Sequence, residues 1–263
     1  MKLKLHLILI FACSSLILVG QESNAYKSKW QIKPLAGANI PLTKLFQGTE
    51  SDYLFQYDDH SYYWQLLSVS YFFSKHWGLE FNYQAGTSSR IRQRADKLTN
   101  LIQQEYRENY YVSPRVGALE EDLNYFGGDI QRGFLGAIYR FETDKFYAYP
   151  KFAIGLTSFY TDWGGADLKE KNSNLEYRIN YSSGKPIPVR DYFTIAPSVS
   201  IGYKLSNRFF LNADFMFSYF KTDLTYKKEI TNLYTNESVV DYFDYKRNIS
   251  TLSLGAGLII VLF

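Results

Sequence analysis

Large apolar side chains recur at every second position over much of the chain, which is the period of a β-strand. From 209 to 219 the odd positions carry Phe, Leu, Ala, Phe, Phe and Tyr, whereas the even positions include Asn212, Asp214 and Ser218. The same two-faced pattern appears in 77–86, 146–156, 193–203 and 251–262. The sequence therefore predicts strands that have one apolar and one polar face.

The polar face of these strands is rich in Gly, Ser, Ala and Thr, with a few charged residues. A soluble sandwich turns its polar face to water and has no need of small residues there. Small residues do suit the crowded interior of a narrow closed barrel. We therefore expect the apolar faces to meet lipid and the polar faces to line a lumen.

The connections between strands alternate between short and long. Short ones lie at 74–76, 142–145 and 205–208, and long ones at 42–61, 87–129, 161–190 and 227–245. Transmembrane β-barrels have tight turns on the periplasmic rim and long loops outside. The sequence thus predicts an all-β fold, a closed antiparallel transmembrane β-barrel of about eight strands with long extracellular loops. The expected strands are 29–40, 62–73, 77–87, 130–141, 146–160, 192–204, 209–226 and 246–263.

The first 25 residues have the organisation of a secretory signal peptide. Lys2 and Lys4 precede an apolar run at 5–19, and Ser23-Asn24-Ala25 has the small-x-small form of a cleavage site. A membrane anchor is the alternative, but this run is shorter than the roughly 20 residues that a spanning helix needs. We expect a cleaved signal peptide at 1–25 and one barrel domain at 26–263.

Composition narrows the function classes. Aromatic residues make up 18% of the chain, which suits strands and lipid–water interfaces. The 29 basic and 26 acidic residues nearly balance, so charge gives no reason to expect nucleic acid as a partner. The only cysteine, Cys13, lies in the leader, which leaves no disulfide or thiolate metal site for the rest.

The leader, the alternation, the short and long connections and the terminal Phe263 together resemble the small OmpA/OmpX-type, porin-like outer-membrane β-barrel family of Gram-negative bacteria. The resemblance implies the cell outer membrane as location and outer-membrane lipid as surroundings. It also implies insertion by the barrel-assembly machinery, which in that family reads a last strand ending in an aromatic residue. Phe263 is therefore the candidate assembly signal.

Several charged residues fall on the predicted lumen face of the strands. Because isolated charges are costly in a narrow barrel, we expect Glu80 and Asp214 to pair with some of the basic groups. The set forms either an ionic plug or a polar pathway for small solutes. Its members are Lys33, Glu80, Arg132, Arg140, Lys151, Lys204 and Asp214.

Candidate chemistry is sparse. The segment Asp58-Asp59-His60-Ser61 is the only one that suggests a hydrolase at the outer rim, but contiguous residues on a strand alternate faces and cannot all converge on one substrate. Asp52 and its neighbours lack the pattern of a calcium-binding loop. We expect no catalytic, cofactor or metal site, and no cofactor.

The long connections differ in character. In 95–112, Leu98, Leu101, Ile102, Tyr106 and Tyr110 recur at helical spacing, which predicts a short helix that caps the barrel mouth, lies on the outer leaflet or binds a partner. The polar 163–177 segment reads as a mobile exposed loop. Tyrosines at 226, 234, 242 and 245 could extend strands above the membrane.

The sequence favours a non-enzymatic protein with a structural or surface-interaction role carried by its extracellular loops. Its extracellular partner is not identified by the sequence. A narrow passive pore for ions or small solutes is the alternative, and a rim-active hydrolase that uses His60 is the third.

Overall fold

The computed structural model describes residues 30–43, 61–88, 100–116, 130–160, 164–183 and 189–262. The predicted signal peptide, His60 and Phe263 lie outside these ranges. Within them nearly every residue belongs to antiparallel strands or tight turns, together with a helix at 100–106. No helix in the described ranges is long and apolar enough to cross a bilayer.

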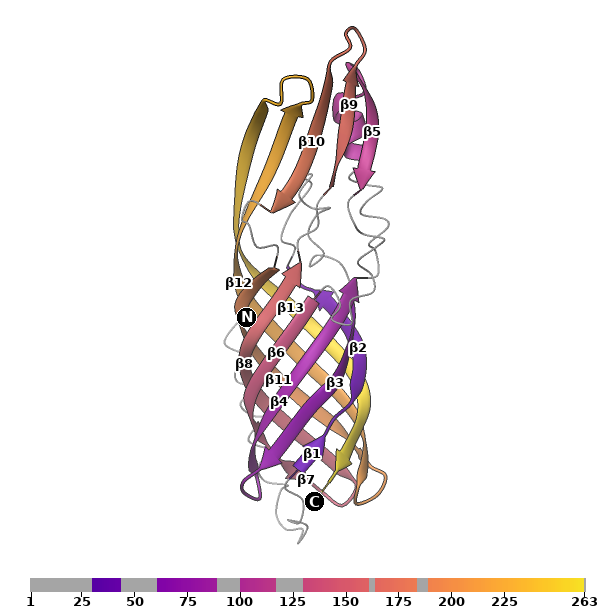
Figure 1. Cartoon of the computed structure of the whole chain (residues 1–263). Helices are drawn as coiled ribbons and strands as arrows, with labels where there is room; N and C mark the ends of the chain where they lie inside the picture. Colours follow the sequence, from indigo (N-terminus) through magenta and orange to yellow (C-terminus); the bar gives the residue numbers. More distant parts are fainter. Residues whose placement is uncertain are drawn as a thin grey trace, which may run out of the picture.

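The strands close into a ring of eight, which confirms the predicted barrel (Figure 1). The ring closes because the last strand pairs with the strand before it and also with the first strand. The short strand β7 (Phe141–Glu142) pairs with β8 at one rim. In ring order the members are β1 (Trp30–Ile32) with β2 (Leu35–Pro41), β3 (Ser61–Phe72), β4 (Trp77–Ser88), β6 (Ile130–Tyr139), β8 (Phe146–Tyr160), β11 (Val189–Lys204), β12 (Phe209–Asn232) and β13 (Ser238–Val261).

The first predicted strand is interrupted, since β1 ends at Ile32 and β2 begins at Leu35. The cause lies in the neighbouring strand β3, where the pairing with β4 shifts register between Trp64 and Leu67. One extra residue there turns Leu66 and Leu67 both outwards, as a β-bulge does. The break leaves Lys33 inside the barrel.

Three tight turns close one rim, at the three predicted short connections. The Ser74 hydroxyl accepts from the backbone N–H groups of His76 and Trp77, and the Ser206 hydroxyl does the same for Arg208 and Phe209. Such local side-chain acceptors favour turns over continued strand. These turns mark the periplasmic side, since transmembrane barrels keep their short connections there.

At the opposite end, β12 and β13 continue far beyond the barrel (Figure 1). Their hairpin turns at 233–237, where Asn236 has a positive φ of 59°, a conformation that asparagine tolerates. Three further strands join β12 edge to edge: β10 (Glu176–Ser183), then β9 (Gly164–Glu170), then β5 (Tyr110–Val116). We call these three strands, with 221–232 of β12 and 238–250 of β13, the projecting sheet.

The projecting sheet corrects three expectations about the loops. The 163–177 segment is a β9–β10 hairpin over most of its length, and 227–245 is mostly strand, in agreement with the tyrosine pattern. The helical prediction over 95–112 is wrong beyond 106, because Tyr110 begins β5. The observed helix lies against β5 and β9, away from the outer leaflet (Figure 1).

One apolar cluster runs from the barrel mouth into the projecting sheet. It includes Ile130, Tyr192, Phe220 and Ile249 from barrel strands, and Ile102, Leu168 and Ile179 from the projecting elements. Burial of this apolar surface stabilises the sheet on the barrel. The two parts therefore share a core.

Candidate functional site

Two regions concentrate polar chemistry: the barrel lumen and the projecting sheet. In the lumen, Lys33, Glu80, Lys151 and Asp214 form a closed square of alternating charge. Lys33 Nζ lies 3.0 Å from Glu80 Oε1 and 2.7 Å from Asp214 Oδ2, and Lys151 Nζ lies 2.9 Å and 3.1 Å from the same two oxygens. We call these four residues the ionic square.

The ionic square spans the lumen. Lys33 lies at the break in the first strand, Glu80 on β4, Lys151 on β8 and Asp214 on β12, which is every second strand around the ring. Hydroxyls complete the coordination, since Ser70 donates to Glu80 at 2.9 Å and Ser200 donates to Asp214 at 2.7 Å. Buried ions are tolerable when they are paired and hydrogen-bonded in this way.

The other predicted interior charges form two further layers. On the extracellular side of the square, Arg132 donates to Asn39 at 2.8 Å and to Ser253 at 3.1 Å. On the periplasmic side, Lys204 Nζ lies 2.7 Å from Glu142 Oε2, and the Arg140 guanidinium stacks 3.5 Å from the centre of the Phe72 ring. The side chains of these layers meet in the lumen rather than leaving it lined by separate charges.

The candidate hydrolase residues do not form a described site. His60 and its two aspartates lie outside the described ranges. His76 lies in a periplasmic turn, where Nδ1 donates to the carbonyl of Arg140 at 3.1 Å and the ring stacks on Tyr139. Among the described residues, no group of three or more His, Cys, Asp and Glu side chains is placed to hold a metal ion.

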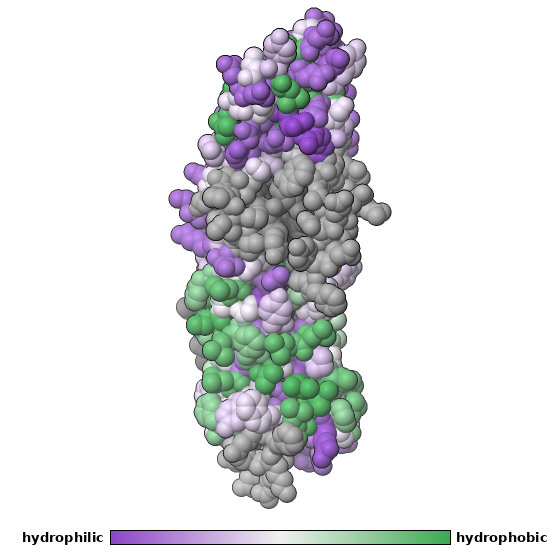
Figure 2. All heavy atoms as spheres, in the orientation of Figure 1, coloured by the Kyte–Doolittle hydropathy of each residue, from purple (hydrophilic) through white to green (hydrophobic). Residues whose placement is uncertain are grey.

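The projecting sheet carries its polar chemistry outside and its apolar residues inside. Figure 2 shows apolar residues gathered around the barrel and polar ones over the projecting sheet on the visible face. Several large side chains remain exposed at the sheet, including Tyr111 at 64%, Tyr234 at 83% and Tyr242 at 62%. Tyrosine supplies rigid contact area with a polar tip, which suits recognition surfaces.

Ion pairs and burial order the side chains of the projecting sheet. Asp167 accepts from Arg178 at 2.8 Å and lies 3.8 Å from Arg115, and this hydrogen bond raises the pKa of the Arg178 guanidinium. Burial raises the pKa of the Tyr106 hydroxyl, which therefore stays neutral at physiological pH. These contacts hold the helix and the strands in one arrangement.

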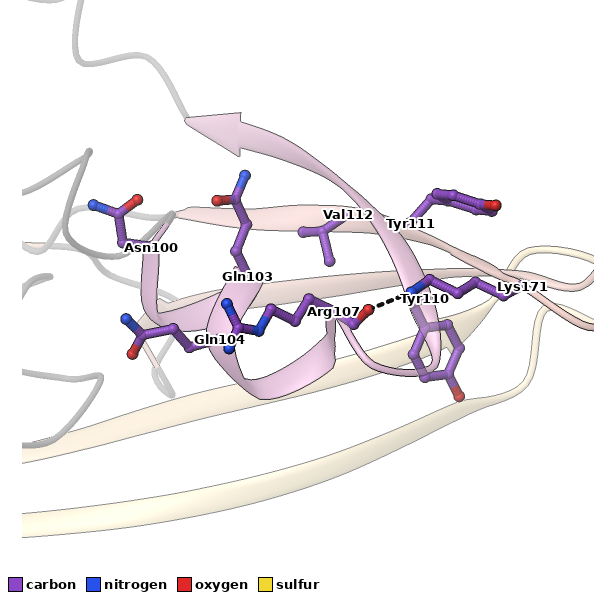
Figure 3. A pocket seen from close by; sticks show the side chains of 8 residues that line it. All are labelled: Asn100, Gln103, Gln104, Arg107, Tyr110, Tyr111, Val112 and Lys171. Atoms are coloured by element: carbon purple, nitrogen blue, oxygen red, sulfur yellow. Dashed lines mark hydrogen bonds between the residues drawn. The ribbon is translucent and has the colours of Figure 1, made fainter.

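A pocket in this region is not anticipated by the sequence analysis. Its walls come from the 100–106 helix, β5 and the β9–β10 turn, and its volume is about 510 Å³ (Figure 3). The one part of the pocket that the sequence indicates is the polar face of the helix. Its residues, at helical spacing, are Asn100, Gln103, Gln104 and Arg107. The pocket itself depends on strands that are distant in the sequence, so spacing alone does not predict it.

No protein-family model and no curated protein matches the chain. Solved structures similar to it include a major outer membrane protein from Thermus thermophilus, which is 9% identical, with 90% of this chain and 100% of that one covered and a TM-score of 0.38. The attachment invasion locus protein Ail of Yersinia pestis is 12% identical, with 89% and 99% covered and a TM-score of 0.34. The outer membrane protease OmpT from Escherichia coli is 11% identical, with 77% and 64% covered and a TM-score of 0.35.

At these scores the likeness assigns no function, and the assignment rests on the barrel itself. An even number of antiparallel strands closes a ring, apolar side chains cover its outside, and tight turns occupy one rim. This is the architecture of transmembrane β-barrels. The chain is accordingly a transmembrane β-barrel protein, with a ring of eight strands in its described ranges.

Proposed function

We propose that the chain is a non-enzymatic surface-interaction protein, anchored by its barrel and binding through its projecting sheet. The observation that carries this proposal is the cluster of buried residues that joins the sheet to the barrel mouth. Loops that only connect strands need no such core. A folded structure held away from the membrane is what a binding surface requires.

The ionic square supports an anchoring role for the barrel rather than a passage. Its four side chains meet from every second strand at 2.7–3.1 Å, so an ion would have to break buried salt bridges to pass. Barrels of this size are usually filled by side chains. Planar-bilayer recordings on the folded chain should be silent, and a steady conductance would favour the pore.

The absence of enzymatic activity is part of the proposal. The hydrolase alternative depends on His60, so a His60→Ala chain should match the parent in any hydrolysis assay with lipid or peptide substrates. Activity that is present in the parent and lost in this variant would favour the hydrolase.

The proposal is tested by the adhesion of liposomes to bacterial and animal cells. One set carries the full chain with the projecting sheet outwards. The other carries a trimmed chain in which 100–116, 164–183 and 223–246 are each replaced by a short Gly-Ser linker, so that the projecting sheet is removed. We expect the full chain to adhere and the trimmed chain to lose adhesion.

Barrel insertion of the trimmed chain is checked by heat-modifiable electrophoretic mobility, which reports the folded barrel independently of the projecting sheet. A trimmed chain that inserts and still adheres as well as the full chain would contradict the proposal. Failure of both chains to adhere to any surface would contradict it as well.

A further inference from the structure

We propose that the pocket in the projecting sheet binds a carboxylated saccharide. This inference rests on the proposed function, because it names a ligand class for the same surface. The polar residues of the pocket come from three elements: the 100–106 helix with the turn after it, strand β5, and the β9–β10 turn (Figure 3). Besides Tyr110, they are Asn100, Gln103, Gln104, Arg107, Tyr111 and Lys171.

The helix presents one complete polar face to the pocket. Asn100, Gln103, Gln104 and Arg107 occupy positions i, i+3, i+4 and i+7, which share one side of a helix. In Figure 3 the Gln103 side chain extends towards β5, and Asn100, Gln104 and Arg107 lie beside it on the helix and the turn that follows. Three carboxamides and one guanidinium are thus gathered on one wall.

The opposite face of the helix fixes this orientation. Ile102 is 1% exposed in the shared apolar cluster. Glu105 pairs with Lys228 at 3.2 Å, and Lys228 Nζ also lies 5.5 Å from the centre of the Tyr106 ring. Because three side chains anchor the helix to the sheet, the polar face cannot turn away from the pocket without breaking these contacts.

The other walls are equally constrained. Tyr110 packs edge-on against Tyr106 and Tyr177, with ring centres 6.1 Å and 5.9 Å apart. Lys171 links the β9–β10 turn to the helix end, since its backbone N–H donates to the Asn109 carbonyl at 3.0 Å and its Nζ donates to the Arg107 carbonyl at 2.7 Å. A preformed pocket loses less entropy when it binds a ligand.

The charge of the pocket selects an anion. Arg107 and Lys171 line it, and none of the lining residues in the described part of the chain is acidic. Elsewhere on the projecting sheet, Arg178, Lys169 and Lys228 each have an acidic partner. Within the described ranges no acidic side chain forms an ion pair with Arg107 or Lys171.

The polar groups select a saccharide among anions. Each carboxamide offers two donors and one acceptor, which matches hydroxyl groups that both donate and accept. The planar guanidinium of Arg107 matches a carboxylate in two parallel hydrogen bonds. The ring of Tyr111, 64% exposed, offers an apolar face beside a sugar ring. The volume of about 510 Å³ lies within the range of small-ligand sites.

The position of the pocket argues against a lipid headgroup of the same membrane. The helix, β5 and β9 lie at the end of the molecule farthest from the periplasmic turns (Figure 1), well beyond the apolar surface of the barrel (Figure 2). A ligand must therefore come from the surroundings of the cell or from a long surface polysaccharide.

The test is calorimetric titration of the full chain in detergent micelles with matched saccharides. The carboxylated probes are 3′-sialyllactose and tetragalacturonate, lactose is the uncharged control, and 3′-sulfolactose carries a different anion. We expect a carboxylated probe to bind at least about tenfold more tightly than lactose, as a charge-assisted hydrogen-bond pair predicts. Equal or tighter binding of 3′-sulfolactose, or no binding of either carboxylated probe, would overturn the proposal.

Variants assign the binding to the pocket. Arg107→Gln should weaken the binding of the carboxylated probe at least about tenfold. Gln104→Glu should weaken this binding further, because the new carboxylate repels that of the probe. Lys246→Gln is the matched control, because it removes the same charge from an exposed position on β13 of the same sheet, away from the pocket, and it should bind like the parent. Weakening by Lys246→Gln equal to that by Arg107→Gln would mean a diffuse charge effect and would overturn the site.

The two proposals fail in distinguishable ways. If the full chain adheres to cells, the trimmed chain does not, and no carboxylated probe binds, the saccharide pocket is wrong while the surface-interaction role stands. If neither chain adheres but the probes bind and depend on Arg107, the pocket stands and the adhesive role is wrong.

Discussion

The barrel and the projecting sheet are built from the same strands but place their residues in opposite ways. Strand β12 runs through both regions, and buried and more exposed residues alternate along it from Phe209 to Tyr226. In the barrel its outward positions are apolar, as at Phe215, and its inward positions include the polar Asp214. Beyond Tyr219 the outward side chains become polar, as at Lys221, and the inward ones are mostly apolar, as at Leu224.

The comparison shows that the medium on the outer face of a strand determines which of its two faces is apolar. Lipid covers the barrel, so its polar groups are inside, whereas water covers the projecting sheet, so its apolar groups are inside. The change between Tyr219 and Lys221 therefore marks the outer surface of the bilayer on β12. Four predictions test this contrast, beginning with the largest effect.

Asp214→Ala should destabilise the barrel by about 3–5 kcal/mol, because it leaves Lys33 and Lys151 buried with only Glu80 as acidic partner. Urea unfolding of the chain in lipid vesicles measures the loss. Asp223→Ala, on the same strand but facing water, is the control and should change stability little. Equal losses of stability in the two variants would mean that Asp214 in the lumen is as well hydrated as Asp223 on the outer surface.

Ile179→Ala should cost about 2–5 kcal/mol, confined to the projecting sheet, because Ile179 is fully buried in the shared apolar cluster. Hydrogen exchange should increase in β9 and β10 while the barrel keeps its folded electrophoretic mobility. Asn180→Ala, the next residue on the other face, should change exchange little. Loss of the barrel together with the sheet would show that the two regions unfold as one unit.

Phe215→Lys should cost about 2–4 kcal/mol, because it puts a charge on the lipid face near the middle of the apolar belt. Thr225→Lys places the same charge on the same strand face beyond the boundary, where it should cost almost nothing. Unfolding of both variants in vesicles gives the difference. Similar costs at the two positions would move the bilayer boundary away from Tyr219.

Asp167→Asn should cost at most about 1 kcal/mol, although it removes the acidic partner of both Arg178 and Arg115. These pairs are more than a third exposed, and exposed ion pairs contribute little and are screened by salt. Hydrogen exchange of β9 at low and high salt measures the effect. A loss as large as that of Asp214→Ala would show that the pair is shielded from water.

Most of the barrel could be predicted because its alternation is strong. Where residues such as Phe217 and Ser218 follow each other, the contrast between faces identifies both strand and orientation. The same reasoning fails for β9, where the inward positions are Gly164, Ala166 and Leu168. Small inward residues give a weak alternation that resembles a loop, and only pairing with β10 and β5 shows it to be a strand.

The pocket could be predicted only in part, for a related reason. Apolar spacing predicts the helix, and Ile102 and Tyr106 do face the sheet. The polar face of the helix can also be predicted from the spacing of its residues. A polar face forms the wall of a pocket only when another element lies opposite it. Here that element includes Lys171, which is distant in sequence and reaches the helix through the β9–β10 turn.

The ionic square also has a consequence for how the protein forms. Lys33 and Asp214 are 181 positions apart, and Lys33 and Glu80 are 47 apart, so the square depends on strands made early and late in synthesis. Contacts between distant residues form slowly because long segments must first be brought together. An incompletely closed sheet would hold unpaired charges in a poorly hydrated space, and a strand slipped by one residue would turn its charge to lipid. The square thus penalises partly assembled and misregistered barrels, and insertion should be all-or-none.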